Sequence, residues 1–311
     1  LTCKHNAQLS AGRVQSPTLA MIVNREEEIR SFKPKTYYTL GANANGYKLS
    51  WVNKDNNSRI FNEEFVKKIE GKLRNAEGQI VNIVEANKKK YSPALYDLTE
   101  LQRDANKIWG YSAKQTLSIM QRLYENYKIL TYPRTDSRYI TTDIVATIPD
   151  RLKAIAIGEY RATADALLKT KINGHKGFVD NSKVSDHHAI IPTEQKPNLA
   201  LLSSEERKIY DLVVKRFLSA MLPPFEYVQT TIEANVSGEK LIAKGKVVKS
   251  KGWKKLYDHL EEDNSEEDIK EQVLPQVNKG DKVNLTKVEL KTGQTKPPAR
   301  FTEATLLSAM E

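Results

Sequence analysis

The chain has 311 residues, 39% of them apolar, which is enough to bury a core and long enough for two or three domains. Its formal net charge is +10, from 49 basic and 39 acidic residues, so a polyanion is a reasonable partner. No run approaches the ~18 apolar residues of a membrane-spanning helix, and the start, LTCKHNAQLS, lacks the pattern of a signal peptide. The single cysteine, Cys3, excludes an intrachain disulfide framework and suits a reducing cytosol.

The first 94 residues predict a helix followed by short strands. Ser16-Pro17 is typical of an N-cap followed by proline in the first turn, and Leu19, Ile22 and Val23 then follow helical spacing. Asn62 can cap a second helix that carries Phe65, Ile69 and Leu73 along one side. Around that helix, β-branched and aromatic segments predict strands, namely TYYTLGA (36–42), GYKLSWVN (46–53) and QIVNIVE (79–85).

From about residue 95 to 222 the pattern is helical. Ser112-x-x-Gln115 predicts a capping box, and the face of that helix is expected to hold Ala113, Leu117, Met120 and Tyr124. Ser203-x-x-Glu206 predicts the start of another helix, and Pro223-Pro224 ends that helix. The buried stripe of this second helix is expected to be Ile209, Leu212, Val213, Phe217 and Ala220.

Strands return in the last third of the chain. They are predicted over EYVQTTIEANV (226–236), KLIAKGKVVK (240–249) and KVNLTKVEL (282–290). The acidic run at 261–271 predicts a solvated loop, and a last helix begins at Thr302. The order therefore predicts an α+β multidomain fold: a helical domain carried on a β domain, which lies between two pieces of a further helical domain.

The segment ILTYPRTDSRYIT (129–141) holds the candidate catalytic group. Because proline keeps the preceding residue extended, Tyr132 and Arg134 point to the same side, and Asp136 can orient the guanidinium. A phenol loses its proton only near pH ~10, so it needs activation to act as a nucleophile. A guanidinium favours the phenolate and binds phosphate oxygens bidentately, which suits attack on a phosphodiester. A structural turn is the competing interpretation.

Other polar residues can serve the same site. Gln121 and Glu125 lie one helical turn apart just upstream, and either can instead belong to a solvated helix face. His187 and His188, in SDHHAIIPT (185–193), can donate to a phosphate or shuttle a proton, or can be ordinary loop histidines. A zinc site is not expected, because no further Cys or His supplies the remaining ligands.

A third feature is SAGRVQSPT (10–18). Gly12 allows close approach of the backbone to a ligand, and Arg13 and Gln15 precede a helix N-terminus, which favours phosphate. An ordinary capped helix start explains the same residues. No Gly-rich ATP-binding loop is present in the sequence.

Together these segments resemble type IA DNA topoisomerases, the topoisomerase III branch in particular. Four stretches carry the resemblance, in order and over nearly the whole chain: SAGRVQSPTLAMIVNREEEI, QRLYENYKILTYPRTDSRYI, SDHHAIIPT and PPARFTEATLLSAME. The resemblance implies that Tyr132 forms a 5′-phosphotyrosyl link to one DNA strand and that Arg134 positions the scissile phosphate. It implies further catalytic neighbours at Gln121, Glu125, Thr131, Thr135, Asp136 and His187. It implies DNA contacts at Ser10, Ala11, Gly12, Arg13, Val14, Gln15, His188 and Arg300.

The resemblance also implies an architecture. It predicts a torus with a helical gate domain over 95–222, a β arch domain over 36–94 and 223–294, and pieces of a helical base domain at 1–35 and 295–311. It implies a monomer that lies in the cytoplasm and associates with the nucleoid. Its implied partner is single-stranded or underwound DNA, and no membrane partner is implied.

The sequence departs from the family pattern at both ends. Nothing matches the Toprim domain, whose acidic residues hold Mg²⁺, and the stretch G-R-P-S-T expected soon after Glu311 is missing. We therefore expect an excised central fragment that binds no cofactor itself and cannot cleave DNA alone.

Two other functions stay open. One is a non-catalytic module for single-stranded nucleic acid, which the basic charge and 14 tyrosines allow. The other is a tyrosine recombinase, although its expected arginine and histidine cluster ahead of a C-terminal tyrosine is absent.

Overall fold

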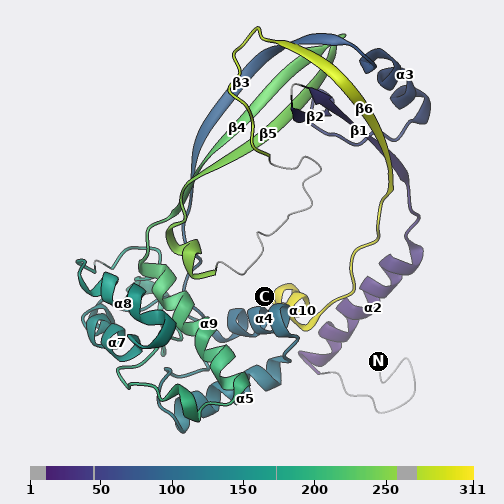
Figure 1. Cartoon of the computed structure of the whole chain (residues 1–311). Helices are drawn as coiled ribbons and strands as arrows, with labels where there is room; N and C mark the ends of the chain where they lie inside the picture. Colours follow the sequence, from purple (N-terminus) through teal and green to yellow (C-terminus); the bar gives the residue numbers. More distant parts are fainter. Residues whose placement is uncertain (1–11, 45, 173, 258–271) are drawn as a thin grey trace, which may run out of the picture.

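The computed structural model describes residues 12–44, 46–172, 174–257 and 272–311. These residues form a torus, with a β barrel on one side and a block of helices on the other (Figure 1). Helix α2 (Gln15–Ser31) and helix α10 (Glu303–Met310) complete the circuit between them. Within the described ranges, no helix combines the length and the apolar character needed to cross a membrane.

The barrel is closed and entirely antiparallel, in the order β1-β2-β5-β4-β3-β6. Closure depends on β1 pairing with β6, from Thr36 opposite Gln294 to Ala44 opposite Leu285. Ser237 and Gly238, both at positive φ, make the two-residue hairpin turn between β4 and β5. The predicted strands are confirmed, with bounds β1 Thr36–Ala44, β2 Tyr47–Trp51, β3 Glu77–Lys90, β4 Phe225–Val236, β5 Glu239–Ser250 and β6 Lys282–Gln294.

Helix α3 (Glu63–Leu73) packs against the barrel. Its predicted cap is confirmed, because the Asn62 side chain accepts the Phe65 N–H at 2.8 Å. The residues that α3 buries are Val66, Ile69 and Leu73, so two of the three residues predicted along one side are buried and Phe65 is not. Phe65 is 49% exposed and places its ring edge-on to Trp51.

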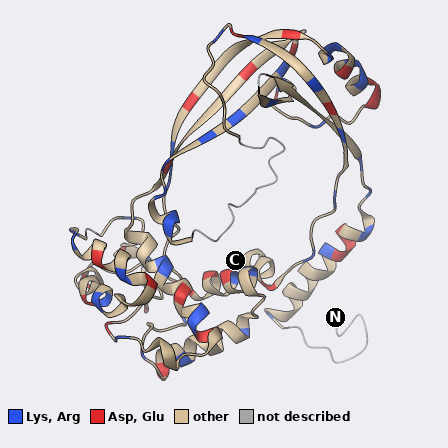
Figure 2. Cartoon of the chain, viewed as in Figure 1, with Lys and Arg blue, Asp and Glu red and all other residues tan. Residues whose placement is uncertain are grey.

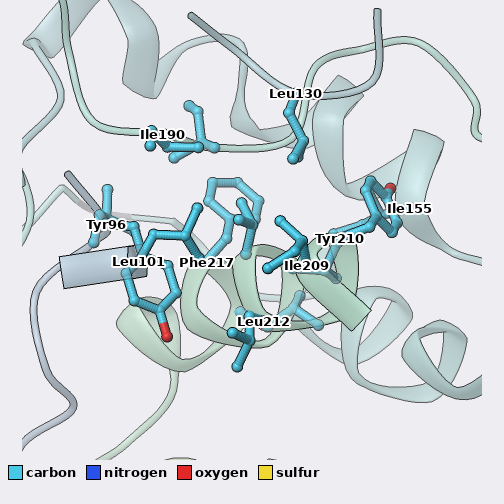
Figure 3. Packing of buried hydrophobic residues seen from close by; sticks show 14 of the residues in the cluster. Tyr96, Leu101, Leu130, Ile155, Ile190, Ile209, Tyr210, Leu212 and Phe217 are labelled. Carbon is cyan, nitrogen blue, oxygen red and sulfur yellow. The ribbon is translucent and has the colours of Figure 1, made fainter. Parts of the chain in front are cut away.

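The helical block has its own hydrophobic core, separate from that of the barrel. Figure 3 shows α9 at its centre, with Leu130 and Ile190 lying over it. The α9 capping box between Ser203 and Glu206 and the predicted buried stripe are both confirmed. The helices are α4 Leu98–Trp109, α5 Ala113–Glu125, α6 Thr142–Val145, α7 Ile148–Ile155, α8 Arg161–Leu168 and α9 Ser204–Met221, with short 3₁₀ turns η1 Gly158–Tyr160, η2 Asn181–Lys183 and η3 Leu199–Leu201.

Two predictions about α5 need correction. Ser112 caps the helix, but the Gln115 side chain donates to Glu205 at 3.0 Å and so does not complete a capping box. The buried face of α5 also differs from the predicted face. Met120 belongs to both faces, but Tyr124, which was predicted on the same face, is exposed. The residues that α5 buries are Thr116, Ile119, Met120 and Leu123.

Helix α2 begins before its predicted start. Its N-cap is Val14, and Ser16 lies inside the first turn, where its hydroxyl accepts the Gly12 N–H at 3.2 Å. The apolar residues predicted at helical spacing, Leu19, Ile22 and Val23, are all exposed. Thr302 does cap α10, as predicted. The predicted acidic loop at 261–271, like the first eleven residues, lies outside the described residues.

Candidate active site around Tyr132

A short antiparallel pairing inside the helical block holds the Tyr132 segment. Leu130 bridges to Pro192, and the Thr131 N–H donates to the Ile191 carbonyl at 3.0 Å. Leu130 and Ile191 are completely buried, so the backbone on both sides of the pairing is fixed by the core. Tyr132 follows directly and is half-buried, which leaves its phenol at the surface of a rigid segment.

Two aromatic side chains hold the phenol ring. The His187 imidazole lies 4.3 Å from the Tyr132 ring centroid at an angle of 39°, and Tyr124 meets it edge-on at 5.4 Å and 81°. His187 comes from the loop 55 positions further along the chain, and Tyr124 comes from the last turn of α5. The structure thus brings together the two predicted residues Tyr132 and His187.

The two predicted threonines brace the backbone of this site. Thr131 Oγ1 accepts the Ile191 N–H at 2.9 Å and donates to the Ala189 carbonyl at 3.3 Å. Thr135 Oγ1 donates to the His187 carbonyl at 2.9 Å. Both hydroxyls therefore tie the tyrosine segment to the histidine loop, which positions the two rings against each other.

A surface hollow of about 410 Å³ lies beside His187. Arg134 and Asp136 stand exposed on its wall, with Arg134 free of ion pairs and hydrogen bonds to the residues that the structure describes. The expectation that Asp136 orients the guanidinium is not met in this structure, since no ion pair joins them among those residues. The lining is Leu98, Thr99, Arg134, Thr135, Asp136, Ser185, Asp186 and His187. An anion entering this hollow would meet the guanidinium first.

The two neighbouring histidines differ. His187 is exposed, whereas His188 is half-buried and places Nδ1 2.7 Å from the Ala189 carbonyl oxygen, which fits an Nδ1–H donor. Burial lowers the pKa of His188, so its imidazole is neutral at pH 7. His188 therefore brings no positive charge to the DNA contact that was predicted for it.

The predicted polar pair, Gln121 and Glu125, lies on α5. Gln121 is half-buried and Glu125 is exposed, and within the described chain neither makes a hydrogen bond or ion pair. The α5 residue that reaches Tyr132 is Tyr124, which was predicted on the same helix face as Met120 and was not among the predicted site residues. Asp186, on the hollow wall, was also missed, although it stands next to His187 in a segment that was singled out.

The predicted DNA-contacting residues at the start of α2 are exposed from Gly12 to Gln15, and Ser10 and Ala11 lie outside the described residues. Arg300, another predicted DNA contact, pairs with Glu26 on α2 at 2.8 and 3.1 Å. This pair raises the pKa of Arg300 and lowers that of Glu26. Arg300 therefore joins the two end pieces of the chain in this structure.

A torus that carries a tyrosine packed on a histidine is the arrangement that the resemblance to type IA DNA topoisomerases predicts. The sequence family of DNA topoisomerases matches residues 1–311, and the chain belongs to that family. It is 55% identical to DNA topoisomerase 3 of Bacillus thuringiensis strain Al Hakam and 50% identical to that of Bacillus subtilis strain 168, each over the whole chain and 43% of the relative.

The fold agrees with this membership. Full-length topoisomerase I from Thermotoga maritima superimposes with a TM-score of 0.71 and 25% identity, over 98% of this chain and 48% of that protein. The predicted family resemblance and fold class are confirmed. The chain spans less than half the length of each of these relatives.

Proposed function

We propose that this chain supplies the nucleophile and the phosphate-binding side chains of a type IA DNA topoisomerase. Tyr132 Oη attacks a phosphorus of one DNA strand, the bond from phosphorus to the 3′-oxygen breaks, and a 5′-phosphotyrosyl ester forms. The phenol proton passes to solvent, with His187 in place to relay it, and the leaving 3′-oxygen takes up a proton. Because the ester retains the energy of the broken bond, the reverse attack reseals the strand without ATP.

One observation carries this proposal: the phenol of Tyr132 packs on His187, and His187 and Arg134 line the same hollow. A guanidinium in that position binds the phosphate oxygens as negative charge develops on them. The rigid pairing beneath Tyr132 supports the chemistry as well, since a nucleophile gains most when its approach is fixed beforehand.

For the whole protein we propose relaxation of negative supercoils and unlinking of DNA circles, on single-stranded or underwound DNA near the nucleoid. In this scheme 95–222 is a gate, 36–94 and 223–294 form an arch, and 1–35 and 295–311 belong to a base. Each of these assignments comes from the family resemblance and is a hypothesis for this chain.

The resemblance also implies Mg²⁺ for the whole enzyme. Among the described residues, no group of three or more His, Cys, Asp or Glu side chains could hold a metal ion. We therefore assign to this chain only steps that its own side chains perform, and we propose that Mg²⁺ belongs to a Toprim domain.

The test joins this chain to the N-terminal and C-terminal regions of a Bacillus relative and measures relaxation of negatively supercoiled DNA with Mg²⁺. Tyr132→Phe should abolish both relaxation and the covalent DNA adduct, because it removes only the attacking oxygen. Tyr37→Phe, at a half-buried tyrosine on barrel strand β1, is the matched control and should relax DNA normally. Equal relaxation by Tyr132→Phe would end the nucleophile assignment.

Two further measurements refine the proposal. Arg134→Ala should slow adduct formation far more than it weakens DNA binding, because the guanidinium acts chiefly on the developing charge. The 311-residue chain alone, given single-stranded DNA and Mg²⁺, should form no covalent adduct. An adduct formed by the chain alone would show that its own residues suffice for cleavage.

A further inference from the structure

A three-stranded ribbon joins the barrel to the helical block. The barrel core reaches Ile83, Ile232 and Ala243, which pair side by side in β3, β4 and β5. Beyond that row the three strands continue toward the helices with most side chains exposed or half-buried (Figure 1). A 3₁₀ turn, η4 (Gly252–Tyr257), follows β5, and its Trp253 indole donates to the Lys90 carbonyl at 2.8 Å. This hydrogen bond fixes the end of the ribbon that lies next to the helical block.

One face of this ribbon is basic. Lys88 pairs with Tyr227, Lys90 with Phe225, and Gln229 with Lys246, and directly paired residues point to the same side of a sheet. We call this side the lysine face, formed by Lys88, Lys90, Lys244, Lys246 and Lys254 with the rings of Phe225 and Tyr227. Figure 2 shows basic positions along the ribbon and on the turn below it.

The ring contacts confirm that these side chains share a side. Lys246 Nζ lies 5.0 Å from the Tyr227 ring centroid and 5.5 Å from that of Phe225. Lys254 Nζ lies 4.2 Å from the Phe225 centroid, so η4 contributes to the same face. Cation–π contacts of this kind hold lysine ammonium groups in place above the sheet.

The two sides of the ribbon differ in the sign of their charged residues. The remaining strand positions of the lysine face are Val84, Ala86, Gln229, Thr231 and Val248, none of them acidic. On the opposite side Glu85 pairs with Thr230, and Lys89 forms an ion pair with Glu226 at 2.7 Å. At its strand positions the ribbon therefore carries only basic charged residues on the lysine face and charged residues of both signs on the opposite side.

We propose that the lysine face binds the sugar-phosphate backbone of a single DNA strand, at a place separate from the site around Tyr132. Lysines two apart on one strand stand ~6.8 Å from each other, which lets neighbouring ammonium groups contact successive phosphates of an extended strand. The half-buried Tyr227 among the lysines, and Tyr91 beside them at 69% exposure, offer rings on which unpaired bases can stack. This inference rests on the proposed function, since both assume a DNA partner.

The test measures binding of the 311-residue chain to a fluorescent single-stranded oligonucleotide across a series of NaCl concentrations. Lys88→Gln with Lys90→Gln should reduce the slope of log K against log [salt] by about 1.4, because each lost phosphate contact on a single strand removes about 0.7. At ~0.1 M salt that corresponds to roughly a tenfold to thirtyfold loss of affinity. The corresponding Arg double variant should restore the slope.

The matched control is Lys54→Gln with Lys196→Gln, which removes the same charge at two exposed positions away from the ribbon. It should leave the slope nearly unchanged. Equal slopes for the ribbon and control variants would overturn the proposal, as would a loss seen with duplex but not with single-stranded DNA. Failure of the wild-type chain to bind any DNA would instead count against the proposed function, so the two failures can be distinguished.

Discussion

The barrel and the helical block bury their cores by different routes. The barrel joins strands from both ends of the chain, with Thr36 paired to Gln294. The block is formed mainly by the continuous segment 95–222, in which α9 packs against α4, α5 and α8. The reactive side chains all lie on the block, and the barrel holds the block at both of its ends. Because the two cores share no residue, we expect that the block can shift as a unit without breaking either core.

The largest expected effect tests whether the two cores are independent. Phe217 is 1% exposed at the centre of α9, and Phe217→Ala should lower the free energy of unfolding of the block by about 3–5 kcal/mol through lost burial and a cavity. Hydrogen exchange with mass spectrometry should show faster exchange in peptides from 95–222 and little change in barrel peptides. The control, Leu201→Ala at an exposed position, should change little. A matching increase in the barrel would show one cooperative unit instead.

A smaller effect is expected at the polar end of α9. Burial alone would raise the pKa of Glu206, but hydrogen bonds from Arg122 and Ser203 outweigh burial and lower that pKa. The stability from this shift is complete above the ordinary Glu pKa of ~4.3 and is lost as the pH falls through the lowered value.

Glu206→Gln should therefore cost about 1–3 kcal/mol at pH 7 and much less at acid pH. Denaturant titrations at pH 7 and near pH 3 measure the difference. The matched control is Glu205→Gln, the exposed neighbour on the same helix. A cost that does not depend on pH would mean that the carboxylate charge contributes nothing.

The next prediction concerns Tyr124, the exposed residue of α5 whose ring contacts Tyr132. An edge-on ring pair contributes about 0.5–1.5 kcal/mol, so Tyr124→Ala should slow adduct formation roughly twofold to tenfold in the joined protein. Tyr124→Phe keeps the ring and should restore the rate. In the 311-residue chain, the NMR signals of the Tyr132 ring should move in the Ala variant only. Unmoved signals would show that Tyr124 does not position the nucleophile.

The sequence predicted most elements of both regions, because strand alternation and helix capping are local patterns. Asn62, Ser203 and Thr302 cap the helices that were predicted to start there. The packing of Tyr124 on Tyr132 was not predictable in the same way, since the rotation of α5 depends on its partners in the core. Arg300 was assigned to DNA, and its pairing with Glu26 joins positions 274 apart in the chain. Contacts across such distances leave no local pattern.

The smallest effect on stability is expected where the block meets α10 and the torus closes. Glu303 accepts the Ala113 N–H at 2.6 Å at the start of α5, and Asn106 accepts the Ala304 N–H at 3.1 Å at the start of α10. Arg103 adds an ion pair with Glu311 at 2.9 Å. α10 buries no residue, so this closure is held by polar contacts that water can replace.

Glu303→Gln with Asn106→Ala should therefore change the unfolding free energy of either core by less than ~1 kcal/mol and still loosen the closure. Energy transfer between dyes at positions 54 and 196, with Cys3 replaced, should show a broader range of distances between the barrel and the block. Glu27→Gln, an exposed carboxylate on α2, is the control and should leave the distances unchanged. An unchanged distribution in the double variant would mean that these polar contacts do not hold the torus closed.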